Sequence, residues 1–173
     1  MASSEERVSL ALPLLDDRAR ERAAEQDWEP ALLDPEDPDE RAILIRLAHP
    51  DLDEAIEAGL DEVEVAGQPM NPRLHLAIHE LVATQVIDDD PPEAFATLQR
   101  LVNCGRDPHE ALHMLGSAVA AQLWSATREQ RPYDRTEHVQ ALAALSGLWD
   151  EQAAGRRSAT GGRRVQRRRR RRG

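Results

Sequence analysis

Two helix starts of the same kind stand in the middle of the chain, at Asn71-Pro72 and at Asp107-Pro108. An Asn or Asp side chain caps free N–H groups at the beginning of a helix, and proline at the first helical position lacks the N–H that would need a partner. The two prolines therefore fix where two helices begin. Each helix carries two histidines four residues apart: His75 and His79 in the first, His109 and His113 in the second.

The spacing of these histidines predicts one shared site. Residues four apart lie on one face of a helix, with Cβ atoms roughly 5–6 Å apart, so each pair can hold one metal ion. A third helix is expected from the Asp90-Pro91 start through Asn103, ended by Gly105. It lies between the two histidine helices and returns the chain, so they run in the same direction.

His75 lies three residues after Pro72, and His109 lies one residue after Pro108. At 1.5 Å per residue the two pairs therefore differ in their position along the helix axis by about 3 Å. We expect all four imidazoles to converge at one level.

Four nitrogen ligands without a thiolate favour a transition metal ion over Mg²⁺ or Ca²⁺. Zn²⁺ is our first choice, with Ni²⁺ or Fe²⁺ as alternatives. A shell of four histidines would be closed and structural, whereas three histidines and a water molecule would leave an open, hydrolytic site. The sequence leaves these alternatives open, and it also leaves open that the histidines only pack or cap the helix starts.

The run from His109 to His113 matches His-Glu-x-x-His, in which two imidazoles hold Zn²⁺ and the Glu activates a bound water molecule. Glu110 is therefore a candidate general base. It also stands at the third helical position after the cap Asp107, where a carboxylate is favoured without any catalytic role. The longer pattern of the metzincins fails, because their third histidine would fall at Val119.

The rest of the chain predicts an all-α fold, a compact bundle of about five to six helices. Aromatic residues make up 3% of the sequence, so the core must be built from Leu, Ala, Val and Ile, which suits helices. We divide the chain into an acidic, loosely ordered N-terminal arm (1–38), the helical bundle domain (39–152) and a disordered Arg-rich tail (153–173). Residues 61–69 are expected to form a connecting loop. Expected core positions of the helix over 72–87 are Leu74, Ile78, Leu81, Val82 and Val86.

Three polar positions outside the two pairs need a separate interpretation. His49 precedes Pro50, at the end of one helix and the start of the next, and we expect a capping or surface role for it. Glu137 and His138 lie on the first turn of the last helix and are expected to be solvated, although they are the candidates for an additional ligand from that helix. Cys104 is the one cysteine of the chain, and we expect it to be buried filler.

The charge of the chain is divided between its body and its tail. Ten of the 22 arginines lie in residues 156–173 and all 32 acidic residues precede them, so residues 1–155 carry a formal charge of −20. An acidic body repels phosphate backbones, and nucleic acid could bind only through the arginines from Arg156 to Arg172. The single cysteine fits a reducing compartment, and no apolar run approaches the ~20 residues of a membrane span. We therefore expect a cytoplasmic location without membrane partners.

The motifs also resemble a known family. The run Asn71-Pro72-x-Leu74-His75 with His79, the Asp-Pro-Pro return, Gly105-x-Asp107-Pro108-His109-Glu110-Ala111-x-His113 and Leu123-Trp124 are similar to the family called domain of unknown function 1841. The resemblance covers about residues 40–148. It implies a small, soluble, bacterial protein whose four histidines form a set, and it implies no reaction.

Two functions fit these observations. The first is a helical protein with a transition-metal site formed by His75, His79, His109 and His113, serving as a metal-dependent hydrolase with Glu110 as general base. The alternative is a non-catalytic helical interaction module whose Arg-rich tail contacts nucleic acid or acidic partners. The substrate or protein partner stays unknown at this stage.

Overall fold

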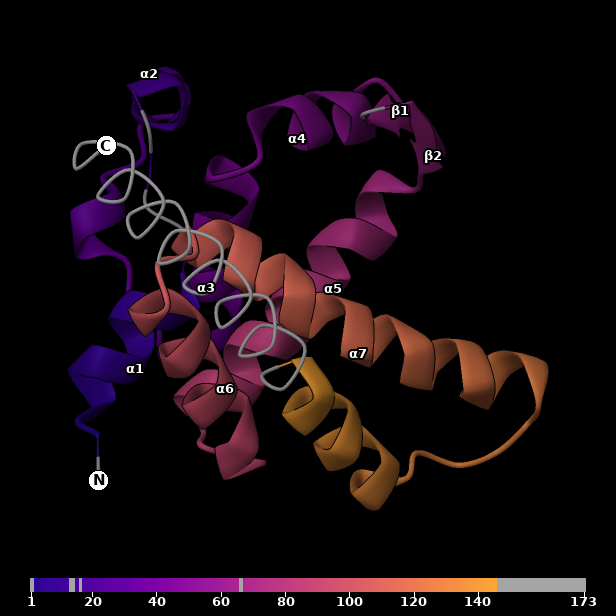
Figure 1. Ribbon diagram of the computed structural model, residues 1–173. Helices are drawn as coiled ribbons and strands as arrows, with labels where there is room; N and C mark the ends of the chain where they lie inside the picture. The colour runs from indigo at the N-terminus through magenta and orange to yellow at the C-terminus, as the bar shows by residue number, and fades with distance from the viewer. Residues whose placement is uncertain (1, 13–14, 16, 66, 146–173) are drawn as a thin grey trace, which may run out of the picture.

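The computed structural model describes residues 2–12, 15, 17–65 and 67–145, and these residues form a helical protein (Figure 1). The expected tail (153–173), with its arginines from Arg156 to Arg172, lies outside the described residues. In chain order the labelled elements are α1 (Ser4–Ala11), α2 (Asp17–Glu25), the 3₁₀ turn η1 (Pro30–Leu32), α3 (Pro38–Leu47), α4 (Pro50–Glu57), β1 (Val63–Val65), β2 (Gln68–Met70), α5 (Pro72–Ile87), α6 (Pro92–Asn103) and α7 (Pro108–Arg128). A further helix covers residues 135–145.

The helix starts follow the proline signals. Asn71 caps α5 by accepting a hydrogen bond from the N–H of Leu74 at 2.9 Å. Asp107 caps α7 by accepting hydrogen bonds from the N–H groups of His109 and Glu110, at 2.9 and 3.1 Å. Because both caps form as the sequence predicts, the histidines lie within the first two turns of their helices.

Helices α5, α6 and α7 contact one another and form the centre of the molecule, as Figure 1 shows. Their buried faces supply most of the core, and helix 135–145 adds Leu142 to it. Gly116 of α7 faces α5 at short range: a Cβ atom at this position would stand 2.9 Å from the Cγ2 atom of Ile78. The absence of a side chain at Gly116 therefore lets the two histidine helices pack closely.

The N-terminal arm differs from the expectation of a loosely ordered segment. Its helix α1 packs against α5, and α2 contacts α3 and α4. Ala11, Ala19 and Ala23 are almost fully buried in these contacts. Val8 and Leu10 of α1 also pack against the core. Helix α2 makes its contacts through alanine side chains and ion pairs, and this is why its sequence suggests weak attachment.

Other expectations are corrected by the described residues. The expected loop over 61–69 contains a two-stranded antiparallel hairpin, in which Val63 pairs with Met70. Cys104 is exposed, because it lies at the end of α6 where the chain turns outward. None of the described helices combines the length and the apolar character that crossing a membrane would require.

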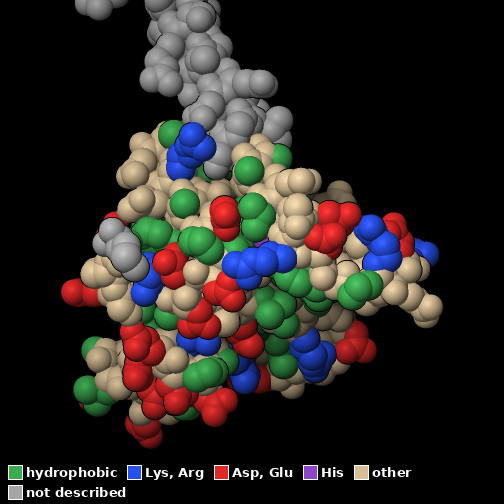
Figure 2. Space-filling model, turned by 90° about the horizontal axis from the view of Figure 1, so that it is seen from below, with side chains coloured by type: hydrophobic (Ala, Val, Ile, Leu, Met, Phe, Trp, Pro, Cys, Tyr) green, Lys and Arg blue, Asp and Glu red, His purple; other side chains and the backbone are tan. Residues whose placement is uncertain are grey.

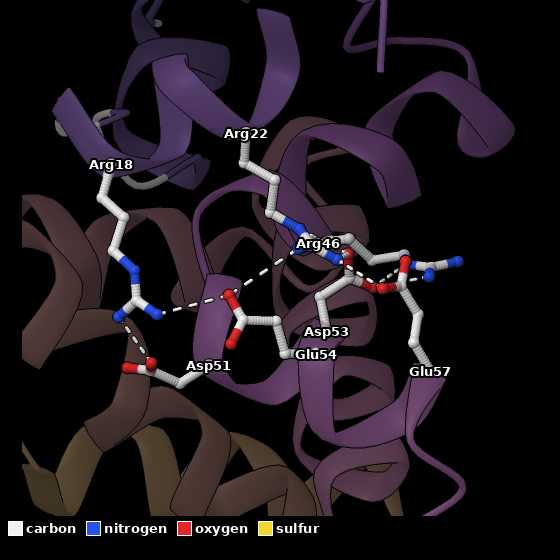
Figure 3. Close-up of polar contacts among 7 residues, drawn as sticks. All are labelled: Arg18, Arg22, Arg46, Asp51, Asp53, Glu54 and Glu57. Atoms are coloured by element: carbon white, nitrogen blue, oxygen red, sulfur yellow. Dashed lines mark hydrogen bonds and ion pairs between the residues drawn. The ribbon is translucent and has the colours of Figure 1, made fainter. Parts of the chain in front are cut away.

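Asp53 of α4 is the centre of a group of ion pairs that joins three helices (Figure 3). Its carboxylate accepts a hydrogen bond from Nη2 of Arg22 on α2 at 2.8 Å and one from Nε of Arg46 on α3 at 2.6 Å. The Asp53 side chain is only 4% exposed. Arg46 and Asp53 lie on either side of the corner between α3 and α4, so their pairing holds that corner closed.

The exposed surface is mixed in charge. On the face drawn in Figure 2, acidic side chains gather with arginines between them. Several arginines of the described residues pair with carboxylates on neighbouring elements, as Arg18 does with Asp51 and Glu54. The arginines of the described residues thus offset part of the acidic charge locally.

The buried ion pairs of Asp53 give the first prediction. Replacing Asp53 by Asn removes the charge that two arginines share, and we expect the free energy of unfolding to fall by about 2 kcal/mol. Urea unfolding followed by circular dichroism measures this change. Asp17→Asn is the matched control, because the Asp17 carboxylate pairs with Arg20 in solvent and should leave the unfolding midpoint unchanged. Equal midpoints for both variants would contradict the role given to Asp53.

Candidate metal centre

The structure brings five histidines together where α5, α7 and the corner between α3 and α4 meet. Histidine rings from α5 and α7 lie close together. The ring centroids of His79 and His113 are 4.8 Å apart, and those of His79 and His109 are 5.2 Å apart. The two pairs thus converge, as their spacing from Pro72 and Pro108 predicts. The fifth ring is that of His49, whose centroid lies 4.4 Å from His79 and 4.8 Å from His109.

His49 corrects the expectation of a capping or surface role. It occupies the N-cap position of α4 without a side-chain capping bond, and it is only 8% exposed. Its Nδ1 atom lies 2.8 Å from the carbonyl oxygen of Ile45. Because a carbonyl can only accept, Nδ1 carries the proton and Nε2 keeps its lone pair. That lone pair points into the cluster, where Nε2 of His49 lies 2.9 Å from Nε2 of His109.

A subset of four histidines is close enough to share one ion. One ligating atom from each of His49, His79, His109 and His113 lies within 4.8 Å of every other. His75 lies beside this group, with its ring centroid 4.8 Å from that of His79 and 5.1 Å from that of His113. His49 thus joins three of the four expected residues in the group, and His75 forms its edge.

His79 holds an unsatisfied ring nitrogen at the centre of the cluster. The residue is 5% exposed, and its Nε2 atom is buried without a hydrogen-bond partner among the described residues. A buried polar atom without a partner costs free energy, so native proteins usually fill such a position with a ligand, an ion or water. The unsatisfied Nε2 atom is therefore free to act as a metal ligand.

All five imidazoles are held in the neutral form that binds metals. Burial is the main cause: it lowers the pKa of His75 and of His109 to about 4 each, and that of His79 to about 2. Burial also lowers the pKa of His49 and of His113. Neighbouring imidazoles lower the pKa of four of the five further, because two charged rings at this distance repel each other.

Glu110 lies at the edge of the cluster. Its side chain is 64% exposed and lies 3.5 Å from Nη1 of Arg106. Its charge raises the pKa of His113 and so offsets part of the effect of burial there. The carboxylate therefore acts on the cluster electrostatically while it faces solvent.

The candidates on the last helix stay outside the cluster. His138 was expected to be solvated but is fully buried, with its Nε2 atom 3.0 Å from Oε1 of Gln85. Glu137 pairs with Arg131 at 3.2 Å. Neither residue belongs to the group of ligating atoms, so the site is made by α5, α7 and the corner before α4.

Comparison with known proteins identifies the family. A family model described as a domain of unknown function, DUF1841, matches residues 33–144, and the chain belongs to this family. The matched region contains all five histidines of the cluster. Searches of the curated proteins and of the solved structures found no match.

The lowered pKa values predict how the metal-free protein responds to acid. The unfolded chain takes up protons on its histidines near pH 6.5, whereas the folded protein resists protonation until the pH is well below that value. Stability is therefore fully present above about pH 6.5 and is lost as the pH falls toward 4. Melting temperatures of chelator-treated protein should decrease between pH 7 and pH 5.

The variant His79→Asn tests whether the histidines cause this loss. Asn takes up no proton in this range, so the decrease between pH 7 and pH 5 should be smaller than in the unchanged protein, whatever the absolute melting temperature. A decrease of the same size in both proteins would assign the acid sensitivity to other groups.

Proposed function

We propose that this member of the DUF1841 family binds a divalent transition metal ion, with His49, His79, His109 and His113 as ligands. The observation that carries the proposal is the group of four ligating nitrogens within 4.8 Å of one another, contributed by three separate segments. His49 and His79 are buried, and burying neutral imidazoles with an unsatisfied nitrogen costs free energy. Apolar side chains of similar volume would fill the same space at lower cost.

The distances favour a site with an open position. Two nitrogens at about 2.05 Å from a zinc ion lie about 3.3 Å apart in a tetrahedron and about 2.9 Å apart at a right angle. The cluster spans 2.9 Å between His49 and His109 and up to 4.8 Å across the group. Even opposite ligands of one zinc ion lie only about 4.1 Å apart, so two nitrogens separated by 4.8 Å cannot both bind it as placed. Three of the four nitrogens would then bind the ion at one time, and the fourth position would be open.

Zn²⁺ is the first candidate, and Ni²⁺ and Fe²⁺ are alternatives. Imidazole is a good ligand for all three ions, whereas Mg²⁺ and Ca²⁺ require oxygen ligands. The hydrogen bond from His49 Nδ1 to the carbonyl of Ile45 supports the proposal, because metal-ligating histidines commonly donate their second N–H to such a partner. That bond orients the ring and raises the basicity of Nε2.

Hydrolysis is the finer proposal, and it depends on metal binding. Zn²⁺ with an open position lowers the pKa of bound water to about 7, and a nearby carboxylate can take the proton. Glu110 follows His109 directly in the His-Glu-x-x-His run, and its charge already acts on His113. Glu110 would be the general base after its exposed side chain turns from Arg106 toward the ion.

Metal content tests the proposed function. Untagged protein incubated with Zn²⁺ and freed of excess metal should retain about one zinc per chain by elemental mass spectrometry. His49→Ala and His79→Ala should each reduce retention at least about tenfold, in line with the loss of a ligand. His138→Gln is the matched control, since it removes a buried histidine outside the cluster and should retain zinc.

Absence of retained Zn²⁺, Ni²⁺ and Fe²⁺ after reconstitution would overturn the proposal. Loss of metal in His138→Gln to the same extent as in His49→Ala would also overturn it, because the effect would then follow stability and not ligation.

The hydrolytic role of Glu110 has its own test. Zinc-loaded protein should hydrolyse p-nitrophenyl acetate at a rate that depends on zinc, and Glu110→Gln should lower this rate at least about 100-fold while zinc is retained. Glu80→Gln removes the carboxylate that follows His79 in the sequence and serves as the control. A rate unaffected by Glu110→Gln would exclude the general base and leave metal binding standing.

A further inference from the structure

A pocket of about 270 Å³ opens between α5 and α7 directly beside the histidine cluster. It begins at His75, His79 and His113 and continues along the two helices in the direction of their C-terminal ends. Its walls are mainly apolar, with Leu112 beside His113 and Ile78 and Val82 farther along α5. A volume near the lower end of the about 300–1,000 Å³ typical of ligand pockets fits a small molecule and excludes a folded partner.

The length of the pocket follows from helix geometry. Its lining residues run from His75 to Val82 on α5 and from Leu112 to Ala120 on α7, so the two ends lie seven residues apart on α5 and eight residues apart on α7. At 1.5 Å per residue this is roughly 10 Å. The pocket is therefore an extended slot with imidazoles at one end and apolar walls along the rest, and it matches a molecule with one polar end.

The charge of the metal ion indicates which polar group the bound molecule should carry at the histidine end of the slot. Four neutral imidazoles would leave both positive charges of a divalent ion uncompensated, and a partly buried uncompensated charge is costly. No acidic side chain is among the described residues that line the pocket. An anionic ligand would supply the missing negative charge and could occupy the open position on the exposed side of His113.

His75 has a defined place in this arrangement. It lines the pocket next to His79 and His113 but lies outside the group of four ligating residues. A neutral imidazole carries one N–H donor, which can bind the carboxylate oxygen that does not bind the metal. His75 would thus be a positioning residue for the anionic end.

We infer that the slot between α5 and α7 binds a small monocarboxylate with a short, unbranched apolar chain, whose carboxylate reaches the metal and whose chain lies against Ile78, Val82 and Leu112. This inference rests on the proposed metal site. It names the ligand class that the site takes.

Cobalt-loaded, untagged protein tests the inference, because the visible absorption of Co²⁺ changes when a ligand enters its coordination shell. Titration with hexanoate should change the spectrum with a dissociation constant at least about tenfold lower than that for acetate, since four more methylene groups leave water. Ala120→Leu should reduce this preference to less than about threefold, because the added side chain fills the slot.

Ala121→Leu is the matched control. Ala121 is the next residue of α7, is exposed and does not line the slot, so the variant should keep the preference for hexanoate. Ser117→Leu, at another lining position on the solvent side of α7, repeats the test if Ala120→Leu does not fold.

The outcomes separate the two proposals. A protein that binds no Co²⁺ overturns the metal site and the inference with it. A protein that binds Co²⁺ but responds equally to acetate and hexanoate overturns the inference alone. Preference for hexanoate that survives in both Ala120→Leu and Ser117→Leu also overturns it, because the chain must then bind elsewhere.

Discussion

Five imidazoles packed within a few ångströms of one another are the constraint on which this structure depends. Burial keeps each ring neutral, so each ring has one N–H donor and one nitrogen lone pair. The five rings therefore have too few N–H groups to give every lone pair a hydrogen bond. His49 and His109 share one hydrogen bond between their Nε2 atoms at 2.9 Å, whereas Nε2 of His79 has no hydrogen-bond partner among the described residues. A divalent ion would bind several of these lone pairs at once, and the binding would offset the free energy that is needed to bury the rings.

The position of His49 depends on an arrangement outside the two histidine helices. His49 reaches the cluster because the chain turns sharply between α3 and α4, and Arg46 and Asp53 hold this turn from either side. Arg22 extends the same ion pairs to α2, so the N-terminal arm supports the corner (Figure 3). Assembly of the site therefore connects the arm to the centre of the bundle.

Much of the fold could be predicted from local signals. Asx-Pro starts fix α5 and α7, and the expected helix over 72–87 agrees with the observed bounds of α5. The face of a helix that turns inward was harder to predict. Leu74 and Leu81 were expected in the core, yet they are 52% and 43% exposed, because α5 is apolar on several sides and its neighbours decide which side is covered.

The candidate site could also be predicted from local signals, but the prediction was incomplete. His75, His79, His109 and His113 share a helical spacing, so their convergence could be predicted from two helix starts. His49 has no such periodic partner, and its place depends on how the corner before Pro50 docks against α5. Its position before a proline, which fixes the local backbone, is the one sequence signal that could have indicated it.

The most direct test of the account is the X-ray absorption spectrum of zinc-loaded, untagged protein at the zinc edge. The account predicts a first shell of nitrogen at about 2.0–2.1 Å with the outer-shell scattering of at least three imidazoles. A first shell made of oxygen or sulfur without imidazole scattering would contradict it.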